Sequence, residues 1–211
     1  MIKGKATKRQ LQAFESKDKL FTAAVKLFER HGYDSVTIED ICSEAGVSKG
    51  LFYNYFSSKE EIFIPVFTQV EDVYRQVRAS FLPTETSTER LLTCVEKVLR
   101  YILDSELRTE ALRIVYSNTL KQPNGFLMKP DRELFSIIAE IIEYGQQRGE
   151  IRTDVSVEAI RRLITTHLFG CYFVWIADAE FDIRRELQRH MLMLMEGISP
   201  ASQKPAHATG Q

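Results

Sequence analysis

Apolar side chains recur every three or four residues along most of this chain, and that spacing restricts its fold more than any other feature. It places the apolar groups on one face of successive α-helices, whereas the strict alternation typical of a half-buried strand is almost absent. The 211 residues include only ten glycines and six prolines, the residues that most often interrupt helices. We therefore predict an all-α protein.

The composition is that of a folded globular chain without a dominant charge. Hydrophobic residues make up 44% and charged residues 27%, and the net charge of −1 gives no overall positive field. The charges are nevertheless uneven, because residues 1–19 hold six basic and two acidic side chains whereas residues 61–211 hold 18 and 21. One end of the chain could face an anion, although a solvated basic tail would show the same pattern.

Cysteine and histidine positions favour neither disulfides nor a metal site. Cys42, Cys94 and Cys171 are odd in number and far apart, which fits a reducing cytoplasm, and we interpret Cys42 as a small buried residue. The longest apolar run, residues 168–177, is too short to cross a bilayer, and no signal-peptide pattern follows the start. We expect a cytoplasmic protein without cofactor or metal, since the four histidines fall singly on different segments: His31, His167, His190 and His207.

The first clear helix ends near Gly32, which can adopt the left-handed conformation of a helix C-terminus. The sequence leaves two possibilities for the residue at which this helix begins. Leu11 and Phe14 could extend the helix towards the N-terminus, or residues 1–16 could form a flexible basic arm. Our predicted domain boundaries follow the second possibility. Its apolar face is expected to consist of Leu20, Phe21, Ala24, Leu27 and Phe28.

Two short helices should follow. Thr37 can cap the first, with Asp40 three residues on completing a capping box, and Gly46 ends it. Ser48 can cap the second, which should end near Tyr55 or Phe56. Helices this short are unstable alone in water, so residues 17–62 should share one small core.

The rest of the chain should form a second helical domain over residues 63–198. Ser58 and Glu61 can open a long helix that runs to about Ser80, and Pro65 should bend it. That bend is either a hinge that moves when a ligand binds or a static kink. Further helices are predicted at residues 88–104, 106–121, 131–148, 156–179 and 183–197, and residues 199–211 should be a disordered tail.

Helix, glycine turn and helix over residues 37–56 is the pattern of a helix-turn-helix, although ordinary helix bundles use it too. In the DNA-binding version the second helix enters the major groove. Ser48, Lys49, Gly50 and Leu51 would then lie at the end that reaches base edges, and Gly50 would permit a close approach. Tyr53, Asn54 and Lys59 are candidates for phosphate contacts.

The amino-acid sequence of this segment also resembles that of a known protein family. It reads Gly32-Tyr33, Val36-Thr37-Ile38-Glu39-Asp40-Ile41, Ala45-Gly46-Val47-Ser48-Lys49-Gly50-Leu51-Phe52-Tyr53-Asn54-Tyr55-Phe56 and Ser58-Lys59-Glu60-Glu61. Residues 17–66 thereby closely resemble the N-terminal domain of TetR-family transcriptional regulators. The resemblance implies a homodimer with a three-helix DNA-binding head and a C-terminal body that binds a small effector. By position, Thr37 would contact phosphate, Ser48 to Leu51 would face DNA, and Tyr53 and Lys59 would hold the backbone.

Residue types in the body suggest its contacts, each with a plain structural alternative. Many aromatic side chains could line an apolar pocket, or simply form the core. The segment 168–177 is apolar on all sides and could pair with a second subunit, or be internal. Our effector candidates are Tyr101, Arg113, Tyr116, His167, Tyr172 and Trp175; our dimer candidates are Leu168, Cys171, Trp175, Leu187, Met191 and Leu194.

These patterns lead us to expect a DNA-binding regulator, not an enzyme. Phosphate-binding glycine loops, nucleophile elbows and H-E-x-x-H motifs are all missing from the sequence. A dimer that inserts two helices into successive major grooves, about 34 to 36 Å apart, requires an approximately palindromic operator. A repressor released by a largely apolar effector is our first reading. The alternatives are an activator of the same fold and a helical scaffold that does not bind DNA.

Overall fold

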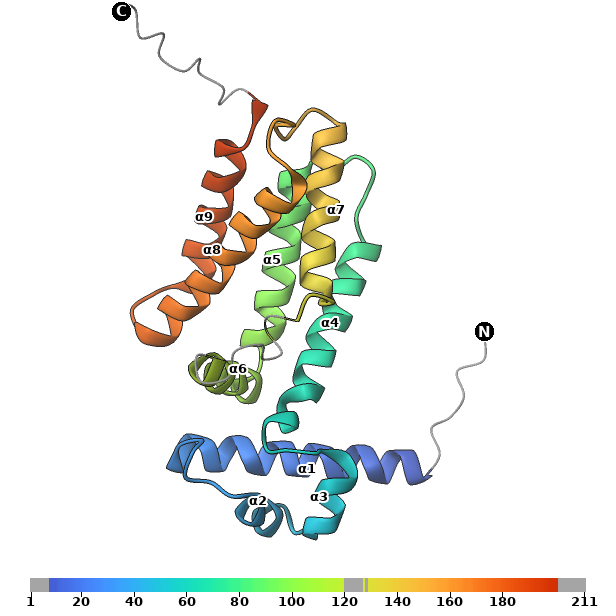
Figure 1. Ribbon diagram of the computed structural model, residues 1–211, viewed down its shortest axis with the longest axis vertical. Helices are drawn as coiled ribbons and strands as arrows, with labels where there is room; N and C mark the ends of the chain where they lie inside the picture. Colours follow the sequence, from blue (N-terminus) through green and yellow to red (C-terminus); the bar gives the residue numbers. More distant parts are fainter. Residues whose placement is uncertain (1–7, 120–126, 128, 201–211) are drawn as a thin grey trace, which may run out of the picture. The chain divides into compact units, whose positions relative to one another are not determined.

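The computed structural model describes residues 8–119, 127 and 129–200, and the regular elements in these ranges are all helices, as predicted (Figure 1). The chain divides into two compact units. The first comprises residues 1–69 and 104–123, and the second comprises residues 70–103 and 124–211. Within the described ranges, no helix is long and apolar enough to cross a membrane.

The first unit is built on one long helix that contacts several shorter ones. Helix α1 packs against α2, the 3-10 helix η1 and α6. Because α1 begins at Lys8, residues 8–16 are helical and not a flexible arm, while residues 1–7 lie outside the described part. The bounds are α1 (Lys8–His31), α2 (Ile38–Ala45), α3 (Lys49–Tyr55), η1 (Glu60–Phe63), the start of α4 (Ile64–Ala79) and α6 (Glu106–Thr119).

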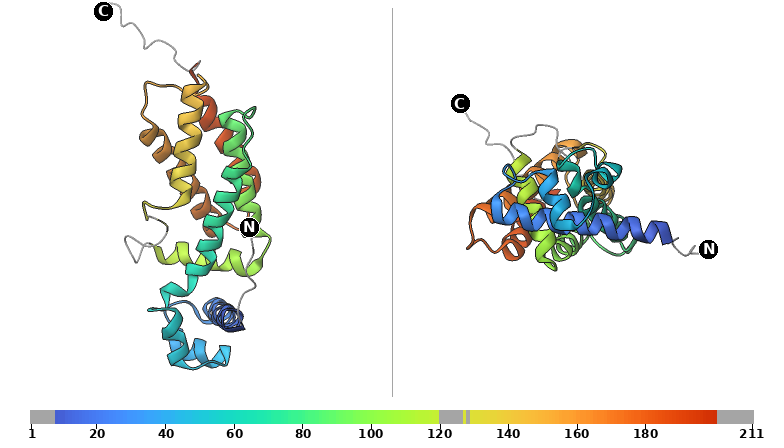
Figure 2. Two further views of the ribbon diagram at one scale, coloured as in Figure 1. Left: turned by 90° about the vertical axis from the view of Figure 1, so that its right-hand side faces the viewer. Right: turned by 90° about the horizontal axis from the view of Figure 1, so that it is seen from below.

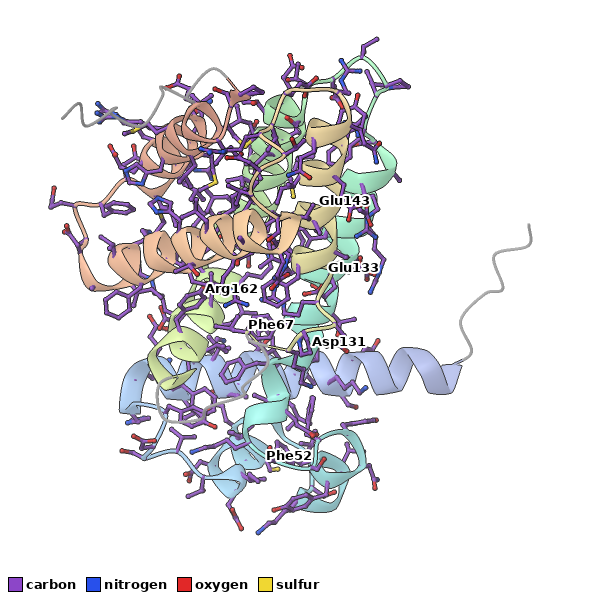
Figure 3. The ribbon with its side chains drawn as sticks, turned by 45° about the horizontal axis from the view of Figure 1, so that its top comes forward. Phe52, Phe67, Asp131, Glu133, Glu143 and Arg162 are labelled. Atoms are coloured by element: carbon purple, nitrogen blue, oxygen red, sulfur yellow. The ribbon has the colours of Figure 1, made fainter. Side chains whose placement is uncertain are left out.

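Aromatic rings and aliphatic groups fill the core of this head. The Phe28 ring lies 4.9 Å from that of Tyr33 and 5.7 Å from that of Phe63, measured between centroids. Phe52 of α3 is fully buried (Figure 3). The predicted face of the first helix is confirmed, with Leu27 only partly covered. Sharing one core explains how α2 and α3, of eight and seven residues, remain helical.

The entry to α4 differs from the prediction by one turn. The Glu61 carboxylate accepts hydrogen bonds of 2.8 Å from the backbone N–H and the hydroxyl of Ser57, one residue before the predicted Ser58. The 3-10 turn η1 comes first and α-helical geometry begins at Ile64. Pro65 therefore lies in the first turn of α4, where a backbone N–H has no partner within the helix. A bend was expected because proline removes a backbone hydrogen bond inside a helix, and at this position Pro65 removes none.

The second unit is a bundle of α5 (Ser87–Leu103), α7 (Glu133–Gln147), α8 (Val157–Ala177) and α9 (Ile183–Gly197), with α4 from Val70 onward. Helix α5 packs on α7 and α9, and α8 packs on the same two helices (Figures 1 and 2). These bounds lie within two residues of the predicted ones at each end. The fully buried side chains are mainly aliphatic: Leu91, Ile137, Ile138, Ile141, Ile142, Ile160, Ile164, Leu187 and Met191.

A buried ion pair connects α4 to the start of α7. Arg132 Nε lies 3.0 Å from Glu71 Oε1, and the second carboxylate oxygen of Glu71 accepts from the backbone N–H of Glu133 at 2.6 Å. Arg75 and Arg78 add more exposed pairs to the Glu133 carboxylate, which marks this end of α7 in Figure 3. Together these contacts hold the second part of α4 alongside α7.

The division into two compact units does not follow the predicted domain boundary at residues 62 and 63. Residues 63–69 and 104–123 belong with the head, because α6 packs against α1. The apolar pattern of α6 shows that it has a buried face but not which helix covers that face. The predicted tail overlaps the description only at Ser199 and Pro200; the rest lies beyond it.

Candidate nucleic-acid interface

Helices α2 and α3 form the predicted helix-turn-helix, and local contacts define both ends of the turn. Asp40 N–H donates to Thr37 Oγ1 at 3.2 Å, and Asp40 Oδ2 accepts from Thr37 N–H at 2.8 Å, which confirms the capping box. The pKa of Asp40 is lowered because its carboxylate accepts from the Thr37 hydroxyl and backbone. Gly46 ends α2 in the left-handed conformation, with φ of 66°.

Helix α3 presents one buried and one exposed face. Phe52 and Phe56 are buried in the head, and Leu51 and Tyr55 are partly buried between the two faces. Ser48 caps the helix as predicted, since its Oγ accepts from Leu51 N–H at 3.2 Å. The exposed face consists of Lys49, Gly50, Tyr53 and Asn54, all four of them predicted DNA contacts.

Two members of this face have properties that the fold itself does not require. Tyr53 exposes half of its surface, although large aromatic side chains are usually covered. A Cβ placed on Gly50 would meet only Ser48 Oγ, at 4.0 Å, so the protein would accommodate a larger residue there. The missing side chain leaves room beside the helix for an external partner.

Lys49 forms an ion pair with Glu39 of α2 across the exposed surface. Their hydrogen bond lowers the pKa of Glu39 and raises that of Lys49, so both remain charged at neutral pH. A phosphate or base edge must compete with Glu39 for the lysine. Helical periodicity does not predict this contact, because the two residues are ten positions apart on either side of a turn.

Lys59, a predicted phosphate contact, also has a structural role within the head. Its ammonium donates to the carbonyl oxygens of Tyr33 at 2.7 Å and Val36 at 2.9 Å, and lies 4.2 Å from the centroid of the Tyr33 ring. These contacts fasten the loop between α1 and α2 to the segment before η1. Sequence spacing could not reveal this structural role, and the phosphate contact of Lys59 stays a prediction.

The effector candidates are divided between the two units. Arg113 and Tyr116 lie on α6 in the first unit, whereas the other four belong to the second. The rings of Tyr172 and Trp175 are 6.4 Å apart, and burial raises the pKa of Tyr172. His167 instead faces His190 on α9, with ring centroids 4.9 Å apart. A cavity of about 240 Å³ between α5 and α9 is lined by none of the six.

The predicted dimer contacts are mostly core residues of one protomer. Leu168, Cys171, Leu187 and Met191 are buried within the chain, and Trp175 and Leu194 are partly buried. A side chain already covered by its own chain has little area left for a partner, and the assignment of these residues to a dimer contact stays a prediction. The apolar pattern revealed that α8 is covered on several sides without showing which side its own subunit covers. The apolar residues left exposed on α8 and α9 are Leu163, Phe173, Val174, Leu192 and Met193.

Comparison with known proteins shows which family the helix-turn-helix segment matches. Residues 20–66, which span the head from α1 to the start of α4, match the family described as bacterial regulatory proteins, tetR family. These residues include the whole helix-turn-helix and all the side chains of its exposed face.

Relatives extend the similarity into the body. The transcriptional repressor NicS of Pseudomonas putida is 28% identical over 171 residues, which covers 78% of each chain. The fatty acid metabolism regulator protein of Bacillus subtilis is 25% identical over 185 residues, 85% of this chain and 93% of the relative. Among solved structures, the repressor FadR of Thermus thermophilus in complex with lauroyl-CoA matches with a TM-score of 0.64 and 25% identity, covering 92% of this chain and 98% of the other. Residues 20–66 therefore match the tetR family of bacterial regulatory proteins, and the chain as a whole is similar in sequence and fold to transcriptional regulators.

Proposed function

We propose that this protein is a homodimeric repressor that binds an approximately palindromic DNA operator through α3 and leaves it when a largely apolar effector binds. The exposed face of α3 carries the proposal. It combines a cation, an aromatic hydroxyl and an amide with a glycine that the protein's own packing does not require. These are the groups that a helix in the major groove uses for phosphates and base edges.

The second half of the proposal needs two copies of α3. Five of the seven large hydrophobic side chains exposed in the described residues lie on α8 and α9. Exposed apolar side chains are typical of a protein–protein contact when they lie together. We assign the dimer interface to this face, and two-fold symmetry then calls for an operator with two half-sites one helical turn apart.

For the effector, an acyl-CoA is the first compound to test. Its support is the FadR relative of Thermus thermophilus, which is described in complex with lauroyl-CoA. Such a ligand regulates only if it prefers the protein conformation that does not bind DNA. A repressor should therefore lose operator affinity as lauroyl-CoA is added. If affinity rises instead, an activator of the same fold becomes the better reading.

Selection of duplexes from a random DNA pool by the purified full-length protein tests the DNA-binding proposal directly. We expect enriched sites with two inverted half-sites, and weaker binding by Tyr53→Ala with an unchanged melting temperature. Glu44→Ala, on the exposed surface of α2, provides the control. A protein-binding scaffold would enrich no site at low salt, and that result would reject the proposal.

A further inference from the structure

Two histidines and a cysteine meet where α8 packs against α9. His167 and Cys171 are four residues apart on α8, so their side chains share one face of that helix. His190 approaches from α9. One ring nitrogen of each histidine and Sγ of Cys171 all lie within 4.8 Å of one another. Single histidines on separate segments gave no reason to expect this cluster.

The distances suit a tetrahedral zinc ion. Bonds of about 2.3 Å to sulfur and about 2.0–2.1 Å to nitrogen place neighbouring ligand atoms roughly 3.5 Å apart. Cys171 Sγ and His190 Nδ1 are already 3.5 Å apart. The remaining ligand atoms are at most 4.8 Å apart and need to approach by at most about 1.3 Å to reach the same geometry. Small rotations of the side chains would supply that movement.

The surroundings leave these atoms available to a ligand. His167 Nε2 is buried and accepts or donates no hydrogen bond within the described part of the chain. Cys171 is buried beside it, and the His167 and His190 rings meet edge to face. A buried imidazole nitrogen without a partner destabilises a protein, and a bound metal ion would satisfy it.

A carboxylate lies behind one of the histidines. Glu186 Oε2 is 3.7 Å from His190 Nε2, on the side of the ring opposite the nitrogen that faces Cys171. Glu186 is four residues before His190 on α9, so the helix itself sets this spacing. Histidine ligands of zinc commonly donate their other ring N–H to such a carboxylate, which fixes the orientation of the ring.

We propose that His167, Cys171 and His190 bind Zn²⁺, with Glu186 orienting His190 and a water molecule completing the tetrahedron. Two neutral imidazoles and a thiolate are ligands that zinc prefers. Binding releases the proton of the Cys171 thiol to solvent. The ion fastens α8 to α9 and adds a metal-dependent contact to the body, which goes beyond the proposed regulation by an apolar effector.

Cobalt titration of the full-length protein, first stripped of metal with a chelator, tests this site. We expect one Co²⁺ per chain, with visible bands of tetrahedral cobalt and a near-ultraviolet thiolate-to-cobalt band, all removed by stoichiometric Zn²⁺. Cys171→Ser should lose the thiolate band, whereas Cys94→Ser, also buried but on α5, should keep it. Glu186→Gln should weaken zinc binding by about ten-fold or more.

The design separates failure of the site from failure to fold. His167→Gln changes a side chain that is only partly buried, and it should lose tetrahedral cobalt binding even if Cys171→Ser unfolds. Circular dichroism establishes that each variant is helical. The proposal is overturned if the wild-type protein gives no thiolate band, or if the band survives in Cys171→Ser. No DNA is present, so the outcome is independent of the proposed function.

Discussion

Two glycines show how differently the same residue can be used. Gly50 on α3 has open space around it, so a side chain there would disturb only an external partner. At Gly145 on α7, a Cβ would come within 2.6 Å of Ile151 Cδ1 and 2.8 Å of Ser87 Cβ. The resemblance pointed to the first role. The second depends on Ser87, far away in the sequence, and could not be predicted from it.

Gly145→Ala should destabilise the protein by about 1–3 kcal/mol, because the added methyl group overlaps two neighbours in a packed contact. Urea denaturation followed by circular dichroism measures the effect. Gly170→Ala is the matched control, since a Cβ at that helical position on α8 meets nothing within 4 Å. Equal stability of the two variants would show that Ile151 and Ser87 move aside freely.

Gly50→Ala should affect operator affinity and not stability. We expect unchanged or slightly higher stability, because alanine favours a helix and finds open space. Operator affinity, measured by fluorescence anisotropy, should fall at least ten-fold if the backbone of α3 approaches a base pair closely, which corresponds to about 1.4 kcal/mol. Unaltered affinity would place Gly50 outside the contact and leave Tyr53 and Lys49 as the candidates.

Glu39→Gln should strengthen DNA binding by a few-fold, because it removes the carboxylate that competes for Lys49. Glu44→Gln makes the same charge change elsewhere on α2 and isolates the local effect from the general one. Anisotropy titrations at two salt concentrations provide the comparison. Weaker binding by Glu39→Gln alone would mean that the ion pair positions Lys49 for the DNA.

At the scale of elements, caps were predictable and partners were not. The capping residues Thr37 and Ser48 act within three residues of themselves, so the local sequence suffices. The serine that donates to Glu61 is Ser57 and not the predicted Ser58, because a 3-10 turn precedes Pro65. The sequence does not distinguish this turn from the start of an α-helix, since the two local geometries are similar. Contacts such as that between α1 and α6 depend on which apolar faces meet, and helical periodicity does not encode this pairing.

The pair Glu71 and Arg132 should be the most sensitive polar contact between elements. Both side chains are buried, and Glu71 also accepts from the backbone N–H of Glu133 at the start of α7. Glu71→Ala would leave a buried guanidinium without its counter-ion, so we expect a loss of about 3–5 kcal/mol in urea unfolding. Asp72→Ala, on the exposed side of α4, is the control and should stay within about 0.5 kcal/mol.

For the whole molecule, the head was predicted far better than the body. Its helix-turn-helix lies within one short stretch with a recognisable pattern, from Thr37 to Phe56. The body brings together residues that the sequence separates, as with His167 and His190, and buries four of the six residues expected at the dimer contact. A helix that is apolar all round shows that it is covered but not by what.

The exposed apolar residues of α8 and α9 lead to a prediction about dimer assembly. Phe173 exposes 59% of its surface on α8, and Leu82, between α4 and α5, exposes 57%. Phe173→Asp should convert the dimer to a monomer in sedimentation experiments, because it places a charge in an apolar contact, whereas Leu82→Asp should not. A monomeric Phe173→Asp variant would present only one α3 to the operator and would make about half the phosphate contacts of a dimer. The slope of log affinity against log salt should therefore fall to about half that of the wild type. A monomer that keeps the full slope would mean that one head makes all the DNA contacts, and a Phe173→Asp dimer would place the interface elsewhere.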